Sequence, residues 1–112
     1  RKAGADQLII ASDQRWAMVT ERRQEPSLDY LLAQLDPVMA DLVLVEGFKH
    51  LAFDKIELHR SVLNKPLLYP EDPNIVAIAC DPGCQLAVPA PPRLAIDDIR
   101  AIADFIATWL AR

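Results

Sequence analysis

The sequence predicts an α/β fold with a mostly parallel sheet, a β-hairpin and flanking helices, and three patterns indicate it. Residues 41–45 and 75–79 are short and almost wholly apolar, as is typical of parallel strands covered on both faces. A helical repeat of leucines over residues 28–35 precedes the first run, so helix and strand alternate. Acids follow both runs, Glu46 directly and Asp81 two positions on, where ligand sites form in such sheets.

Length and composition set the outer limits of the prediction. A chain of 112 residues predicts one domain, residues 1–112, with a single core. Its 52% hydrophobic residues argue against a globally disordered chain. The net charge of -4 argues against binding nucleic acid or anionic lipid. No apolar run approaches the roughly 20 residues that span a membrane, and no secretory signal is found. We therefore expect a cytoplasmic protein that needs neither nucleic acid nor a membrane.

The first elements predicted are a helix end and a hairpin. Residues 1–5 read as the last turn of a helix, with Gly4 near its end. Residues 8–12 and 15–20 are short strands separated by Asp13 and Gln14, which predicts a β-hairpin.

A helix and the first parallel strand follow. Ser27 is a candidate N-cap, and the leucines after it repeat at helical spacing until Asp36 and Pro37 end the helix. The apolar residues of the predicted helix are Leu28, Leu31, Leu32 and Leu35. Residues 41–45 are then expected to form the buried strand described above.

The second half of the chain predicts three strands and a helix. Residues 54–60 alternate, with Ile56 and Leu58 apolar, which predicts a half-exposed strand. Residues 64–74 carry three prolines and read as an extended loop before the buried strand 75–79. A short strand is expected at 94–96.

The last predicted element is a helix that Asp97 caps and that runs to about residue 111. Its apolar face is expected to comprise Ile99, Ile102, Ala103, Ile106 and Leu110.

Cys80 and Cys84 are separated by three residues. A single such pair supplies too few ligands for a structural zinc site, and no second Cys or His pair occurs. We interpret the two thiols as reduced core residues. An enzyme that uses either thiol as a nucleophile lacks support, because no Cys–His arrangement is recognisable.

Three stretches, taken together, resemble one protein family. They are residues 1–5 running into Ser-Asp-Gln-Arg-Trp-Ala at 12–17, residues 41–50 with Val-Glu-Gly-Phe-Lys-His, and the proline-rich segment 64–74 running into the buried strand. Over nearly its whole length the chain resembles the molybdopterin-guanine dinucleotide biosynthesis protein B family (MobB).

This resemblance implies a P-loop NTPase-like α/β fold, GTP and Mg²⁺ as ligands, and a dimeric accessory protein. The implied partner is the molybdenum cofactor guanylyltransferase, protein A, and the implied cargo is molybdopterin or its guanine dinucleotide. Family members carry a Walker A loop before the matched region, whereas neither G-x-x-x-x-G-K-[ST] nor G-x-G-x-x-G occurs here. We therefore expect the chain to be the carboxyl-terminal part of a longer protein, and to be inactive by itself although the intact protein would hydrolyse GTP feebly.

The resemblance also implies roles for four residues. Glu46 would be the catalytic residue and would hold Mg²⁺ through water, since Mg²⁺ keeps much of its hydration shell. Gly47 would present a backbone N–H to the γ-phosphate, and Lys49 would add positive charge to a phosphate. Asp81 would accept hydrogen bonds from guanine. For Glu46 and Gly47 the alternative is a charged turn after the first strand. For Lys49 it is a solvated surface lysine, and for Asp81 it is an ordinary turn residue before Pro82 and Gly83.

Two functions follow from these observations. The first is an accessory GTP-binding protein of molybdenum cofactor synthesis. The second is a non-catalytic dimerisation or adaptor module that docks the guanylyltransferase and carries cofactor. For either, we expect a homodimer formed through the hairpin, residues 8–20, or through an exposed sheet edge, with Trp16 and Met18 in core or dimer packing.

Overall fold

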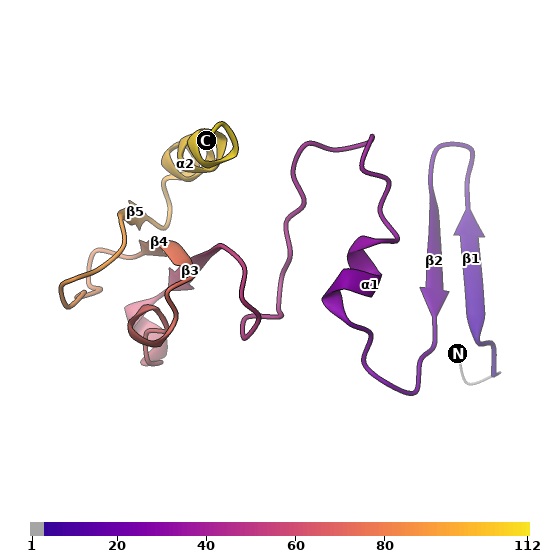
Figure 1. The fold of residues 1–112 in the computed structure, drawn as a ribbon, viewed down its shortest axis with the longest axis horizontal. Coiled ribbons are helices and arrows are strands. Elements are labelled where there is room, and N and C mark those ends of the chain that lie inside the picture. The colour runs from indigo at the N-terminus through magenta and orange to yellow at the C-terminus, as the bar shows by residue number, and fades with distance from the viewer. Residues whose placement is uncertain (1–3) are drawn as a thin grey trace. The chain divides into compact units, whose positions relative to one another are not determined.

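The computed structural model describes residues 4–112 and divides the chain into two compact units, one up to Val43 and one from Leu44 to Arg112. Figure 1 labels the elements of both. The predicted helical turn at residues 1–5 falls mostly outside the described residues, and Gly4 itself has a non-helical φ of 87°. That the whole chain is one domain stays a prediction.

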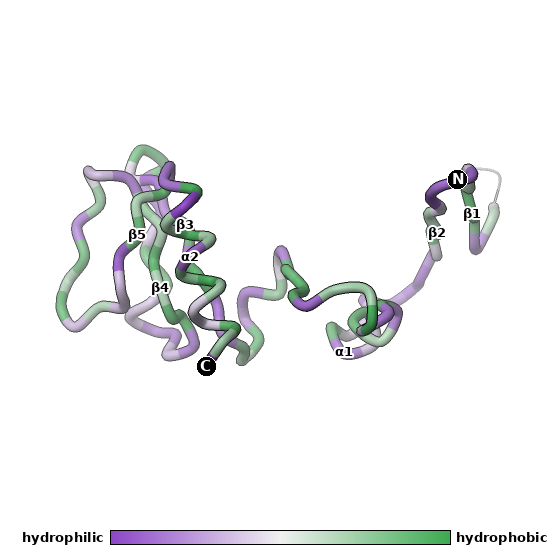
Figure 2. The backbone as a smooth tube through the Cα atoms, turned by 90° about the horizontal axis from the view of Figure 1, so that it is seen from above, coloured by the Kyte–Doolittle hydropathy of each residue, from purple (hydrophilic) through white to green (hydrophobic). Residues whose placement is uncertain are grey.

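The first unit begins with the predicted hairpin, which is confirmed. Strand β1 (Gln7–Ala11) pairs antiparallel with β2 (Trp16–Thr20). The Ser12 N–H donates to the Arg15 carbonyl (2.8 Å), which closes the turn around Asp13 and Gln14. All ten strand residues are exposed, and much of the ribbon is apolar (Figure 2).

Helix α1 (Leu28–Leu32) is shorter than the leucine repeat predicts. Ser27 is its N-cap as predicted, because its hydroxyl accepts a hydrogen bond from Tyr30 N at 3.1 Å. After Leu32 the backbone tightens into turns that bond three residues back, Leu35 N to Leu32 O at 3.1 Å among them. The leucines gain little burial, so little tertiary packing extends the helix beyond its first turns.

The prediction of a buried strand at residues 41–45 is wrong. No residue from 41 to 50 is in a strand, and the side chains of Val43 and Leu44 are 47% and 74% exposed. A strand exists only through hydrogen bonds to a neighbouring strand, and no such ladder includes this run within residues 4–112. The apolar pattern records β-propensity, while pairing decides whether the strand forms.

The second unit is built on a parallel three-stranded sheet, which confirms the α/β class. Its order is β3 (Lys55–His59), β4 (Ile75–Cys80) and β5 (Arg93–Ala95). The central strand β4 is buried almost throughout, as its apolar run predicts. The core joins Ile75, Ile78, Cys80 and Cys84, with Leu67, Tyr69 and Leu86 packed against it.

Strand β3 exposes the opposite face from the one that alternation predicts. Glu57 is 7% exposed, whereas Leu58 is 69% exposed. Glu57 lies beside Ile78 in the sheet register, on the face that the loop of residues 64–74 covers. The acid is buried because that loop brings backbone N–H donors to it, as described below.

Helix α2 (Ile99–Leu110) follows β5 and is capped by Asp98, not Asp97. The Asp98 carboxylate accepts a hydrogen bond from Ala101 N at 3.0 Å. Trp109 and Arg112 both donate to Asp54, which ties the helix end to the approach of β3. Only Ile102 and Ile106 of the predicted apolar face are partly buried, together with Ala101, Phe105 and Trp109.

The loops between strands contain two short 3-10 turns, η1 (Ser61–Leu63) and η2 (Tyr69–Glu71). In the part of the chain that the structure describes, no helix is long and apolar enough to cross a membrane.

Candidate functional site

A cavity of about 360 Å³ lies in the second unit, at the amino ends of β3 and β4. Its lining residues come from the segment after Gly47, from the start of β3 and from the end of the proline-rich loop. Its lining residues are Lys49, His50, Leu51, Ala52, Lys55, Leu68, Glu71, Asp72, Pro73 and Asn74. Of the four predicted site residues, the cavity includes Lys49.

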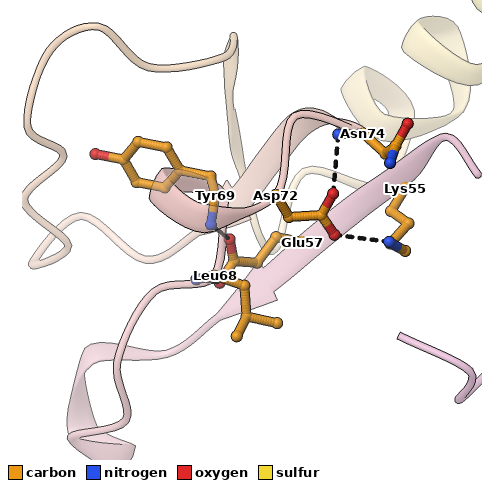
Figure 3. Close-up of polar contacts among 6 residues, drawn as sticks. All are labelled: Lys55, Glu57, Leu68, Tyr69, Asp72 and Asn74. Carbon is orange, nitrogen blue, oxygen red and sulfur yellow. Dashed lines mark hydrogen bonds and ion pairs between the residues drawn. The ribbon is translucent and has the colours of Figure 1, made fainter. Parts of the chain in front are cut away.

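Two of the lining residues, Lys55 and Asp72, form an ion pair (Figure 3). Lys55 Nζ donates to Asp72 Oδ2 at 2.6 Å, and both side chains are largely shielded, at 12% and 20% exposure. Asp72 Oδ1 accepts from Asn74 N at 2.9 Å. These bonds, the one from Lys55 foremost, hold the pKa of the Asp72 carboxyl below its usual value of 3.8. The Lys55 ammonium also lies 5.2 Å from the centre of the Phe53 ring.

Glu57 fastens the cavity wall to the sheet (Figure 3). Its two carboxylate oxygens accept hydrogen bonds from the backbone N–H groups of Leu68 (2.7 Å) and Tyr69 (2.9 Å). Sequence reasoning missed this residue. An acid between two apolar strand residues resembles any solvated position, and only the returning loop gives it partners.

Glu46 and Gly47 lie on an irregular turn of the second unit. Gly47 has a φ of 84° and Phe48 a φ of 54°, and Leu51 N donates to Phe48 O at 3.0 Å. A Cβ added to Gly47 would meet no atom within 4 Å, so the demand for glycine is conformational and the space is open. The Glu46 side chain is exposed, and no described residue is its hydrogen-bond partner.

Whether these residues suit Mg²⁺ depends on what else could coordinate it. Among residues 4–112 no group of three or more His, Cys, Asp or Glu side chains could hold a metal ion. Mg²⁺ often takes only one or two protein carboxylates and completes its shell with water and phosphate oxygens. Glu46 is exposed, so it would be accessible as one such carboxylate if a nucleotide supplied the phosphate oxygens.

Asp81 is engaged within the protein. Its carboxylate accepts hydrogen bonds from Ser61 N (2.7 Å) and from the Ser61 hydroxyl. These two bonds lower the pKa of Asp81 from 3.8 to about 2. The turn after it is clamped by Arg93, whose guanidinium donates to the carbonyls of Asp81 and Cys84, each at 2.7 Å.

The structure does not bring Lys49 and Asp81 together. Lys49 lines the cavity at the amino end of β4, while Asp81 follows its carboxyl end. The strand spans six residues. At about 3.3 Å a residue, the two ends lie roughly 20 Å apart.

Cys80 and Cys84 are buried core residues, as predicted. They are 1% and 4% exposed, and both thiols are free. Burial, followed by the hydrogen bond with Cys84, raises the pKa of Cys80 above its usual value. Thiols in such surroundings are unreactive.

Comparison with known proteins now identifies the family. The sequence profile of the family "Molybdopterin guanine dinucleotide synthesis protein B" matches residues 1–81, most of the chain. The chain belongs to the MobB family. Every cavity residue, together with Glu46, Gly47 and Asp81, falls inside the matched segment.

Two curated relatives extend the match across the whole chain. A molybdopterin-guanine dinucleotide biosynthesis adapter protein of Haemophilus influenzae is 45% identical over 111 residues, which cover 98% of this chain and 60% of the relative. The protein of the same description from Escherichia coli K12 is 41% identical over 115 residues, covering 100% of this chain and 64% of the relative. The chain thus spans about three fifths of the length of these relatives.

The pairing of Asp81 with Ser61 in this MobB chain predicts a specific dependence of stability on pH. A carboxyl whose pKa is lower in the folded state than in the unfolded state stabilises above the unfolded pKa, and the contribution fades as pH falls through the folded one. For Asp81 the window runs from 3.8 down to about 2. Ser61→Ala should therefore destabilise the protein near neutral pH, and the difference should shrink below about pH 3.

Urea denaturation of both proteins across that window provides the measurement. A difference in midpoint that stays constant down to about pH 2 would show that the Ser61 hydroxyl acts independently of the Asp81 charge.

Proposed function

We propose that this chain is a non-catalytic adapter module in the synthesis of molybdopterin guanine dinucleotide. It docks the molybdenum cofactor guanylyltransferase, forms a homodimer, and carries molybdopterin or its guanine dinucleotide as cargo. The description of the two relatives as adapter proteins supports a docking role. The observation that carries the proposal is the hairpin, whose two faces are both apolar and exposed.

The register of the hairpin sorts its side chains into two faces. Paired residues of an antiparallel ladder point to the same side, so Ile9 joins Met18 and Trp16 on one face, and Ile10 joins Leu8 and Val19 on the other. The exposed fractions are 62%, 47% and 67% on the first face and 64%, 42% and 44% on the second.

A ribbon of this kind needs a covering surface. An isolated two-stranded hairpin is at best marginally stable in water, and contiguous exposed apolar patches mark sites of protein interaction. Two apolar faces provide one surface for a second copy of the chain and one for the guanylyltransferase. We assign the face with Trp16 to the dimer, because large aromatic residues dominate the energetics of such interfaces.

The adapter role is tested by titrating this chain into the guanylyltransferase in a calorimeter. Ile10→Asp places a charge in the proposed docking face and should weaken binding by at least about tenfold. Ile99→Asp is the matched control, because Ile99 is 81% exposed on helix α2, outside the hairpin. Equal affinities for both variants, or no binding by the unaltered chain, would exclude hairpin docking.

GTP binding is the second candidate function, and the turn at Glu46 and Gly47 favours it. An exposed carboxylate beside a glycine with open space above it suits a phosphate with its Mg²⁺. In this proposal Lys49 adds charge to a phosphate and Asp81 reads guanine. Localisation in the cytoplasm accords with both candidates.

Calorimetry with GTP and Mg²⁺ separates the two functions. For an adapter without a phosphate-binding loop, we expect this chain to bind no tighter than about millimolar. In the full-length family protein, Glu46→Gln should abolish Mg²⁺-dependent GTP hydrolysis. Micromolar binding of GTP by this chain would favour the nucleotide-binding function, and normal hydrolysis by the Glu46→Gln protein would remove the catalytic role of Glu46.

A further inference from the structure

The cavity at the amino ends of β3 and β4 has the size of a small-molecule site. Its volume of about 360 Å³ falls within the roughly 300–1,000 Å³ of ligand pockets. Leu51, Ala52, Leu68 and Pro73 give it apolar surface, which suits the body of an organic ligand. It lies at the opposite end of β4 from Asp81, and none of its lining residues belongs to the hairpin.

One wall of this cavity is fixed before any ligand arrives. Glu57 holds the backbone of Leu68 and Tyr69, and the Lys55–Asp72 pair holds the far end of the same loop (Figure 3). Because these hydrogen bonds already hold the loop in place, binding a ligand costs little conformational entropy in the loop. Such preorganisation favours affinity.

The charges of the cavity indicate what the ligand carries. The positive charge of Lys55 neutralises Asp72. The Lys55 ammonium group has three N–H donors, and one of them donates to that carboxylate. Lys49 and His50 also line the cavity, their side chains are exposed, and neither has a hydrogen-bond or ion-pair partner among residues 4–112, so both can contact an anionic group. Glu71 is the remaining acid, and it can accept a hydrogen bond from a hydroxyl or N–H of the ligand.

Resting on the cargo role proposed above, we propose that this cavity binds the phosphate end of a small organic phosphate monoester. Lys49 and His50 contact the phosphate, the apolar lining residues contact the organic body, and Glu71 and Asn74 meet its polar groups. The lining residues include neither the hairpin residues nor Asp81.

Three matched probes test the proposal on the full chain: phenyl phosphate, inorganic phosphate and phenol. Amide chemical shifts in ¹H–¹⁵N NMR spectra report where each one binds. Phenyl phosphate should shift the amides of His50, Lys55 and Asn74 and bind tighter than inorganic phosphate, because its ring adds apolar contact. Phenol should cause no saturable shift, because it lacks the charge that Lys49 and His50 contact.

A pair of lysine variants assigns the charge. Lys49→Ala should weaken phenyl phosphate binding by about fivefold or more, the scale of one lost charge contact. Lys65→Ala is the control, because Lys65 is exposed in the loop of residues 64–74 but does not line the cavity. The affinity of this variant for phenyl phosphate should stay within about twofold of the unaltered chain. The Ile10→Asp hairpin variant should bind phenyl phosphate as the unaltered chain does. A failure of the cavity proposal is therefore distinguishable from a failure of the adapter role.

The proposal is overturned by any of three results. These are the absence of saturable shifts with phenyl phosphate, equal weakening in the Lys49 and Lys65 variants, or shifts of phenol that match those of phenyl phosphate. If inorganic phosphate binds as tightly as phenyl phosphate, the ring contact is refuted and only an anion site is left.

Discussion

Replacing Glu57 with alanine is expected to destabilise the second unit by about 3 kcal/mol, one of the larger effects available to a single substitution. The carboxylate accepts from Leu68 N and Tyr69 N, and hydrogen bonds to a charged group contribute more than neutral ones. Alanine leaves both N–H donors without an acceptor and opens a gap beneath the loop. The change is measured as the free energy of unfolding in urea.

Two further variants show whether the effect comes from these bonds. Glu57→Gln keeps one carbonyl acceptor but turns an N–H group toward the other donor, so it should lose about half as much stability. Leu58→Ala, on the exposed side of the same strand, should change stability by less than about 0.5 kcal/mol. If Leu58→Ala costs as much as Glu57→Ala, strand propensity, not the loop clamp, determines the loss.

Trp16→Asp is expected to weaken self-association by about a hundredfold, since it removes an aromatic anchor and puts a charge into a desolvated surface. Trp16 is 67% exposed within the chain and shares its hairpin face with Ile9 and Met18. Sedimentation equilibrium should report twice the 12.5 kDa chain mass for the unaltered protein and the single mass for the variant.

The matched control for that experiment is Gln24→Asp. Gln24 is exposed in the same unit outside the strands, so it adds the same charge without touching the apolar face. A monomeric unaltered chain at all concentrations, or dissociation of the Gln24→Asp protein alone, would refute the hairpin dimer.

Much of the fold was predictable because its signals are local. Apolar continuity identified β4, the turn residues Asp13 and Gln14 identified the hairpin, and Ser27 identified the start of α1. Each of these depends on residues within a few positions of one another. The MobB motif at residues 45–50 identified the family for the same reason.

The errors arise where long-range pairing decides the outcome. The run at 41–45 has the composition of a strand, yet among the described residues no ladder includes it, so it is not a strand. Alternation along β3 correctly predicted a strand but the wrong exposed face, because the loop residues Leu68 and Tyr69, 11 and 12 positions later, return to bond Glu57. A long-range contact also positions Asp81, whose carboxylate accepts its hydrogen bonds from Ser61, twenty positions away. Its contact with guanine stays a prediction.

By itself, the sequence determined the α/β class, the family, the hairpin and the buried pair of cysteines, because periodicity and motifs depend on residues that are close in sequence. Only the tertiary structure decided that Glu57 is a buried clamp, that Lys49 lines a cavity with the Lys55–Asp72 pair, and that Asp81 lies at the other end of β4. These three features depend on which loop packs against which strand. Such contacts are set by hydrogen bonds and packing between segments far apart in the chain, which a local pattern does not record.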